Sequence, residues 1–174
     1  PSKYTSVQYF QVATKALPLD LVKSVLPNGE GCWDTASVMS SFRLDADNRL
    51  ILGGIGNLGH SASKIHTNWA RRKIESLFPH LKNIDIEFCW HGRIAMTGDH
   101  IPKILRLGSN AYSVFGYSGR GIGPGTYFGK AVSECLISGD ETSLPVDPLD
   151  YYQEPFSKIK AGFIEFGATA SHLL

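Results

Sequence analysis

Residues 115–130 read FGYSGRGIGPGTYFGK, and this glycine-rich stretch is the most distinctive part of the 174-residue chain. It holds six of the 18 glycines and lies between a predicted strand at 111–116 and a helical pattern that starts near residue 124. Strand, glycine loop and helix in this order direct backbone N–H groups and the positive end of a helix dipole towards an electron-rich ligand. We therefore predict an anionic or polarised ligand here. The alternative is a tight corner that packs the helix closely against a sheet.

Two common phosphate-binding motifs do not match this loop. The dinucleotide fingerprint G-x-G-x-x-G fails because its third glycine would fall on Pro124 or on Thr126. The P-loop G-x-x-x-x-G-K-[ST] fails because Pro124 replaces its first glycine and Ala131 replaces its magnesium-binding hydroxyl. We expect Pro124 to be the first helical residue and Gly123 to be the cap, which leaves nearby amides unpaired. The loop is therefore not expected to enclose a diphosphate.

The composition is that of a globular protein with a substantial core, because 43% of the residues are hydrophobic. A formal net charge of +1 without long charge runs argues against nucleic-acid binding. No apolar run is long enough to span a bilayer. Cys32, Cys89 and Cys135 form no C-x-x-C pair and the histidines form no H-x-x-x-H pair, so we expect a cytoplasmic protein without a metal site.

Hydrophobic patterning predicts an α+β fold. Strands are predicted at 6–14, 39–44, 49–54, 84–90, 93–97 and 111–116. The second and third form a hairpin, and 84–90 alternates as a strand with one buried face. Helices are predicted at 17–26, at 61–78 and after the glycine loop, where Gly139 ends the helix. One face of that last helix carries Phe128, Ala131, Val132, Cys135 and Leu136. The tail from residue 149 shows no strong pattern.

Four segments, in order over roughly residues 9–148, resemble the FAD-dependent D-amino-acid oxidase superfamily. FRLDADNRLILGG (42–54) resembles the family's R-x-x-x-D-G-R hairpin, with Asn48 where glycine is usual. WHGRIAMTGDHIPKI (90–104) resembles W-x-G-x-x-x-x-T-x-D-x-x-P. GYSGRGIG (116–123) resembles G-[FY]-S-G-H-G, and the next helix ends in the family's E-x-[IL]-x-x-G pattern. The γ-glutamylputrescine, sarcosine and glycine oxidase branches are the most similar.

The resemblance implies that residues 1–98 belong to a substrate-binding domain with a mostly antiparallel sheet and flanking helices. Residues 99–148 would then be the closing strand, loop and helix of a Rossmann-like FAD domain, followed by a tail at 149–174. The N-terminal half of that FAD domain, with its strand, G-x-G-x-x-G turn and helix, is expected to be absent. We therefore expect the C-terminal part of a larger flavoenzyme, inactive alone and without FAD. Apolar surface meant for the missing half is expected to drive self-association.

The resemblance also implies how FAD is bound. Its ring would contact the backbone of the loop, and the helix dipole would stabilise the charge of reduced flavin. Arg120 replaces the family's usual histidine and either faces the ring or faces solvent. No thiol lies nearer to the motif segment than Cys89, so we expect noncovalent FAD. The predicted cofactor-binding residues are Gly119, Arg120, Gly121, Ile122 and Gly123.

The implied reaction is hydride transfer from the carbon next to a primary or secondary amine, or from an amino acid, onto FAD. The catalytic residues stay unknown. Arg43 is a candidate partner for a substrate carboxylate; the alternative is that it is an ordinary arginine on the surface of the sheet. His91 and Arg93 are candidate substrate contacts. Asp99 is expected to fix the turn before Pro102 rather than to act as a base.

Two other classes of function are alternatives to the oxidoreductase. A noncatalytic α+β protein-binding or assembly domain stays open, with the glycine loop as a structural corner. A serine hydrolase is disfavoured because Arg120 stands where the G-x-S-x-G motif around Ser118 needs its last glycine. Its catalytic histidine could only be His172, near the end of the chain.

Overall fold

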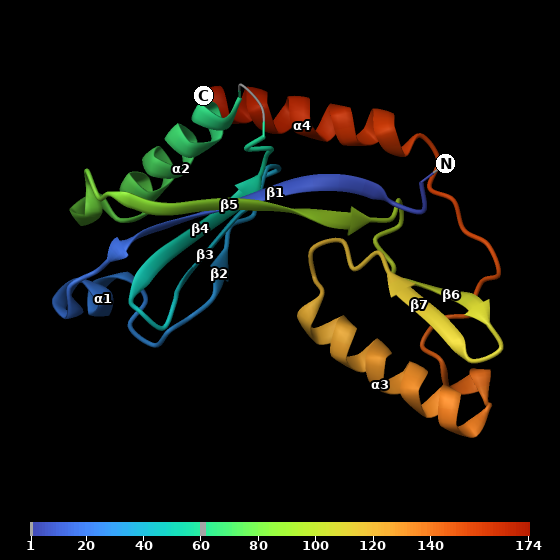
Figure 1. Cartoon of the computed structure of the whole chain (residues 1–174). Coiled ribbons are helices and arrows are strands. Elements are labelled where there is room, and N and C mark those ends of the chain that lie inside the picture. Colours follow the sequence, from blue (N-terminus) through green and yellow to red (C-terminus); the bar gives the residue numbers. More distant parts are fainter. Residues whose placement is uncertain (1, 60–61) are drawn as a thin grey trace. The chain divides into compact units, whose positions relative to one another are not determined.

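The computed structural model describes residues 2–59 and 62–174 (Figure 1). The chain divides into two compact units, and neither is one continuous stretch of sequence. These are the loop unit (up to Val7, with Ile94–Gly162) and the sheet unit (Gln8–Arg93 with Phe163–Leu174). The assignment of 1–98 to a substrate domain and of 99–148 to an FAD domain stays a prediction.

The larger sheet has five strands in the order β2-β3-β4-β1-β5. The β2–β3, β3–β4 and β4–β1 pairs are antiparallel, as expected for a mixed fold with an antiparallel sheet. The five strands are β1 (Thr5–Ala16), β2 (Cys32–Trp33), β3 (Ser40–Leu44), β4 (Arg49–Ile55) and β5 (Ile86–Met96).

The predicted hairpin is confirmed as β3 and β4, and its turn is stabilised by side-chain hydrogen bonds. Asn48 has a φ of 62°, a conformation that asparagine tolerates better than most residues. The Asp45 carboxylate accepts hydrogen bonds from the backbone N–H groups of Asp47 (2.9 Å) and Arg49 (2.8 Å). A glycine at position 48 is therefore not required for this turn.

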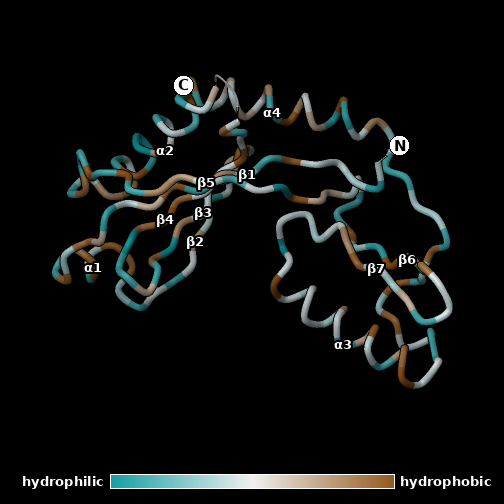
Figure 2. Tube along the Cα trace, viewed as in Figure 1, coloured by the Kyte–Doolittle hydropathy of each residue, from teal (hydrophilic) through white to brown (hydrophobic). Residues whose placement is uncertain are grey.

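The core of the sheet unit lies between the sheet and its helices. Apolar residues run along β4 (Figure 2), and strand alternation places Leu50 and Leu52 on one face. Both side chains are fully buried and belong to one cluster with Phe10 of β1 and with Ala70 and Ile74 of the helix α2. Burial of each large apolar side chain contributes about 1.5–3 kcal/mol, so this cluster is the main stabilising element of the unit.

Three helices lie where the pattern predicted them. α1 (Leu19–Val25) falls within 17–26 and α2 (Ser63–Leu77) within 61–78, whose first residue, Ser61, lies outside the described residues. α3 (Ile122–Ser138) follows the glycine loop, and Gly139 ends it with a left-handed φ of 74°. A short 3-10 turn, η1 (Pro79–Leu81), follows α2. No helix in the described ranges is long and apolar enough to cross a bilayer.

The strand β5 differs from the prediction in two ways. One continuous strand replaces the two expected at 84–90 and 93–97, because Gly92 fits within an extended strand. Residues 87–93 are exposed, whereas one buried face was predicted. β5 is the edge strand of the sheet, and only Ile86 near its start packs against the helix-covered core. An alternating sequence at a sheet edge therefore does not guarantee a buried face.

The loop unit contains a hairpin and α3. Its strands are β6 (Lys103–Gly108), which was not predicted, and β7 (Ala111–Phe115). Phe128, Ala131 and Cys135 of α3 are buried as predicted, but Val132 and Leu136 are not. In the described residues the second sheet consists of β6 and β7, so it covers a narrower face of the helix than the pattern implied.

The tail contains a helix that the sequence pattern did not reveal. α4 (Ser157–Leu173) includes Gly162 and Gly167, and glycine costs about 1 kcal/mol in a helix relative to alanine. The short 3-10 turn η2 (Glu141–Ser143) precedes it. Tertiary contacts at the C-terminal end of α4 compensate for the low helix propensity of its two glycines.

Those contacts form a buried histidine pair in the sheet unit. The Nδ1 atoms of His66 and His172 lie 2.8 Å apart, and His66 Nε2 lies 3.2 Å from Glu165 Oε1. The Trp69 ring stacks on His172, and Arg72 donates to the His172 carbonyl oxygen (2.6 Å). Burial, with His66 and Arg72 nearby, lowers the pKa of His172 to about 4. The pair therefore joins α4 to α2 through a neutral His172 ring.

Candidate functional site

The loop between β7 and α3 is a tight turn with three left-handed residues. Gly116, Ser118 and Gly119 have φ values of 84°, 52° and 87°. The Arg120 amide donates to the Tyr117 carbonyl oxygen (2.9 Å) and closes the turn. Ser118 offsets its unfavourable conformation because its amide donates to Ala95 O (3.2 Å) and its hydroxyl to Gly116 O (3.1 Å). The loop is therefore held in one conformation by the loop unit itself.

Thr97 is the residue beneath this turn. A Cβ atom at Gly116 would lie 2.5 Å from Thr97 Cγ2, so only glycine fits there. Thr97 is buried, its hydroxyl donates to Ile101 O (3.0 Å), and its amide donates to Ser118 Oγ (3.4 Å). Two of the sequence motifs thus meet at one contact. Thr97 is the threonine of the motif at 90–104, but the motif assigns it no role, and no pattern in the sequence predicts its contact with Gly116.

Asp99 fixes the turn before Pro102, as predicted. Its carboxylate accepts from the Ile101 amide (3.0 Å) and from Lys103 Nζ. The hydrogen bond from Lys103 holds the pKa of Asp99 below its usual value. An ionised carboxylate with these partners is a turn-stabilising group and a poor proton acceptor.

The helix α3 begins earlier than predicted. Gly121 is the N-cap and Ile122 the first helical residue, whereas the prediction placed the cap at Gly123 and the start at Pro124. The helix can extend past Pro124 because amides in a first turn have no intrahelical acceptor, so proline loses nothing there. The first helical hydrogen bond runs from Gly125 N to Gly121 O (2.9 Å).

Three amide groups at this helix start are available to a ligand. Within residues 2–59 and 62–174, no acceptor is found for the N–H groups of Gly121, Ile122 and Gly123. Ile122 is 92% exposed, and a Cβ atom at Gly123 would meet no described residue within 4 Å. Donors at a helix N-terminus favour acceptor atoms that carry negative charge. The loop therefore offers an open contact surface for the electron-rich edge of a ligand.

The other predicted site residues lie elsewhere. Arg120 is exposed, and its guanidinium has no hydrogen-bond or ion-pair partner in the described part of the chain. Arg43 is exposed on β3, opposite Ile51 of β4, and His91 and Arg93 are exposed on β5. β3 and β5 are separated by two strands, about 14 Å at the usual spacing. The sheet therefore does not bring Arg43 together with His91 and Arg93.

Residues 3–135 match the family model of FAD-dependent oxidoreductases known as DAO. The chain belongs to this family. It is 32% identical over 139 residues to a probable oxidoreductase OrdL of Haemophilus influenzae, covering 80% of this chain and 31% of the relative. It is 29% identical over 158 residues to the γ-glutamylputrescine oxidoreductase of Escherichia coli, covering 90% and 37%. The chain thus spans about a third of the length of these curated relatives.

The fold is similar to that of L-proline dehydrogenase from P. horikoshii. The TM-score is 0.57 at 22% sequence identity, and the match covers 82% of this chain and 38% of that one. The likeness supports the mixed architecture of helices and antiparallel sheet.

The residues present fit one part of FAD and not another. The three free amides and the open space at Gly123 fit the polar edge of a flat ring. One G-x-G-x-x-G spacing does occur, from Gly54 to Gly59, but it follows an antiparallel strand. A Cβ at Gly54 would lie 2.8 Å from Trp69, and one at Gly56 would lie 2.7 Å from His66. The chain's own rings occupy this space, so these glycines do not fit a diphosphate.

Proposed function

We propose that this chain carries the ring-contact loop and part of the substrate domain of an FAD-dependent amine or amino-acid oxidoreductase. The observation that carries the proposal is the set of three unpaired amides at the open start of α3. The family match over residues 3–135 supports it, and so does the similarity to a γ-glutamylputrescine oxidoreductase. The family match does not favour the alternative of a noncatalytic binding domain.

FAD, when bound, supplies the electron-accepting ring. The amides of Gly121, Ile122 and Gly123 would donate to acceptor atoms of this ring and would favour the negative charge of its reduced form. These donors need no rearrangement, because the turn is already closed by hydrogen bonds from Arg120 and Ser118. Arg120 adds a positive charge beside them. We expect noncovalent binding, since the loop has no cysteine and Cys89 lies on β5.

Substrate recognition is assigned to the exposed polar residues of the sheet. Arg43 presents a guanidinium that can bind a carboxylate of an amino-acid substrate through two hydrogen bonds. Because β3 and β5 are not adjacent, a small substrate reaches either Arg43 or the pair His91 and Arg93. In the full-length protein, Arg43→Met should raise KM for a carboxylated amine and leave KM for a simple amine unchanged. An equal effect on both substrates would remove Arg43 from the proposed site.

The test of the ring contact is the substitution Ile122→Pro in the full-length protein. Proline is tolerated at the first helical position and removes one of the three amide hydrogens. Loss of one hydrogen bond to a charged acceptor, about 1.5 kcal/mol, should lower the reduction potential of bound flavin by about 30 mV. Ile122→Val is the matched control, because it changes the side chain and keeps the amide. Equal potentials in the two variants would contradict the proposed contact.

A further inference from the structure

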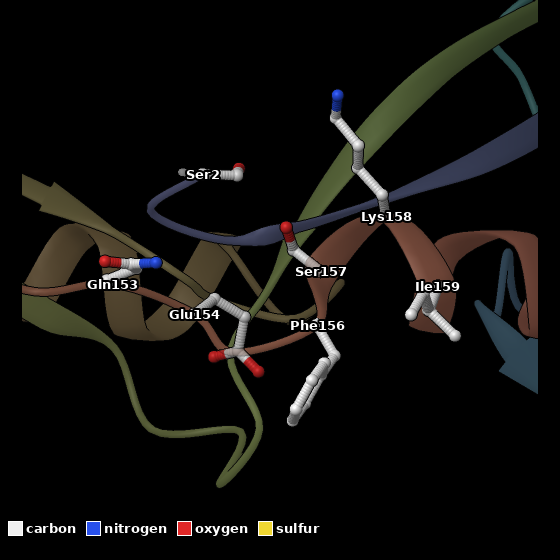
Figure 3. A pocket seen from close by; sticks show the side chains of 7 residues that line it. All are labelled: Ser2, Gln153, Glu154, Phe156, Ser157, Lys158 and Ile159. Atoms are coloured by element: carbon white, nitrogen blue, oxygen red, sulfur yellow. The ribbon is translucent and has the colours of Figure 1, made fainter.

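Glu154, in the segment that leads into α4, is a buried carboxylate with three hydrogen-bond donors. Figure 3 shows its side chain pointing away from that of Lys158 at the start of the helix. Glu154 is 2% exposed. Its oxygens accept from the Gly98 amide (3.0 Å), the Tyr152 hydroxyl (2.7 Å) and Lys160 Nζ (2.6 Å). Glu154 lies among the residues that line a pocket, but both of its oxygens already accept from the protein's own donors, so its contacts are those of a structural group.

The carboxylate is ionised in this environment. Burial alone would raise its pKa, but the hydrogen bonds from Lys160, Tyr152 and Gly98 outweigh burial and hold the pKa of Glu154 below its usual value. Burial, together with the hydrogen bond to Glu154, raises the pKa of Tyr152 to about 12. A charged acceptor makes shorter and stronger hydrogen bonds than a neutral one. Gly98 is therefore held more firmly than an ordinary turn residue.

Gly98 connects this carboxylate to the glycine loop. A Cβ atom at Gly98 would lie 3.1 Å from Glu154 Oε1, so the two groups are in close contact. The neighbouring residue is Thr97, whose methyl group lies against Gly116 and whose amide donates to Ser118 Oγ. Each step of this path lies within the loop unit.

We propose that Glu154 is a positioning residue for the glycine loop. Its carboxylate holds Gly98, and through Gly98 it holds Thr97 beneath Gly116, so that the turn keeps the amides of residues 121–123 in place. What these amides contact rests on the proposed function. The positioning itself is a property of this chain and can be tested without flavin.

The experiment measures amide hydrogen exchange of the full-length protein, resolved for Ser118 and Arg120, whose amides donate to the carbonyl oxygens of Ala95 on β5 and of Tyr117 in the turn. Glu154→Gln keeps the shape of the side chain but cannot accept from both Gly98 and Lys160. Exchange of the Ser118 and Arg120 amides should rise by about tenfold, as expected for the loss of one charge-assisted hydrogen bond. Unchanged exchange in a folded Glu154→Gln protein would overturn the proposal.

Two matched variants separate positioning from other effects. Lys160→Met removes the α4 arm of the network and keeps the bond to Gly98, so exchange in the turn should change less than twofold. Asp150→Asn alters an exposed carboxylate in the same segment, paired with Arg106 at 3.0 Å, and should leave the turn unaffected. If either variant opened the turn as much as Glu154→Gln does, Glu154 would be a general support of the tail.

A milder variant covers the case in which Glu154→Gln does not fold. Glu154→Asp keeps the charge and withdraws the carboxylate from Gly98, so the turn amides should again exchange faster while Lys160 keeps a partner. Protection equal to the parent's would contradict the proposal. Should Glu154→Gln speed exchange while Ile122→Pro leaves the flavin potential unchanged, positioning would stand and the proposed flavin contact would fail.

Discussion

Two pairs of glycines in this chain have very different surroundings. On β4, a Cβ atom at Gly53 would lie 2.7 Å from the Tyr9 ring, and one at Gly54 would lie 2.8 Å from the Trp69 ring. At the start of α3, among the residues that the structure describes, a Cβ at Gly121 would meet Tyr117 alone, at 3.9 Å, and one at Gly123 would meet nothing within 4 Å. The space left by the missing side chains is filled by the protein on β4 and is open at α3.

This difference separates glycines whose free space the protein itself fills from glycines whose space is open. A glycine-rich motif in the sequence is compatible with either role, as the unused G-x-G-x-x-G spacing from Gly54 to Gly59 shows. The open pair is also the one beside unpaired amides. Free volume together with unpaired donors is therefore the feature that points to a ligand.

The largest expected effect is that of Gly54→Val on stability. The new methyl groups would overlap the Trp69 ring in a packed core, so the free energy of unfolding should fall by about 3 kcal/mol. Urea denaturation followed by circular dichroism measures this change. A loss below about 1 kcal/mol would show that Trp69 can move aside, and the contrast between the two pairs would weaken.

A smaller loss is expected for Gly116→Ala, at the edge of the open loop. Alanine at a φ of 84° is strained, and its Cβ would lie 2.5 Å from Thr97 Cγ2. We expect a loss of about 2 kcal/mol in the free energy of unfolding. The double variant Gly116→Ala with Thr97→Ser, which lacks the opposing methyl group, should recover part of the loss. No recovery would mean that backbone strain alone causes it.

The region in which protein rings fill the space beside the glycines also predicts that stability depends on pH. His66 occupies the space beside Gly56 and forms a hydrogen bond with His172. The pKa of His172 is lowered to about 4, so between pH 6.5 and 4 the unfolded chain binds more protons than the folded one. Above pH 6.5, His172 is neutral in both the folded and the unfolded chain and does not lower the free energy of unfolding. As the pH drops from 6.5 to 4, this free energy falls by up to about 1.4 kcal/mol per pH unit.

Unfolding measured in urea at several pH values tests this dependence. The titratable and charged groups near the His172 ring are His66 and Arg72 of α2, and Glu165 of α4 forms a hydrogen bond with His66. His172→Phe keeps a ring next to Trp69 and has no titrating group, so the slope between pH 6.5 and 4 should become shallower. An unchanged slope would assign the dependence to other groups.

The smallest effects are expected at the open glycines. Gly123→Ala and Gly129→Ala both place a Cβ atom in open space on α3, and each should raise the free energy of unfolding by at most about 1 kcal/mol. The two variants should differ in flavin binding, because only Gly123 lies beside the free amides. If both variants bound FAD like the parent, the open space at Gly123 would not be a ligand contact.

Local chemistry made part of the fold predictable from the sequence. The hairpin of β3 and β4 follows from strand alternation and from a turn in which Asp45 accepts hydrogen bonds and Asn48 adopts a left-handed conformation. Gly139 was identified as the end of α3 for the same kind of local reason. The order of the motifs also identified the family, which the match over residues 3–135 confirms.

The remaining features depend on contacts between distant residues. α4 contains two glycines, and its end is held by the contact of His172 with His66, 106 positions away. The exposure of β5 depends on its place at the sheet edge. At the candidate site, unpaired amides were predicted from the expected helix start at Pro124, which the structure moves to Ile122. Thr97 and Glu154 were not given a role because their partners are distant in the sequence.

The pairing of His66 with His172 has a consequence for how the protein is made. On a ribosome, residue 66 is synthesised 106 positions before its partner, a delay of about 5–20 s at common elongation rates. During that time the apolar surface around Phe10 and Trp69, which later contacts His172, has no cover from α4. A chaperone that recognises exposed aromatic residues would therefore find its binding site there on the nascent chain, and lose it when residue 172 docks.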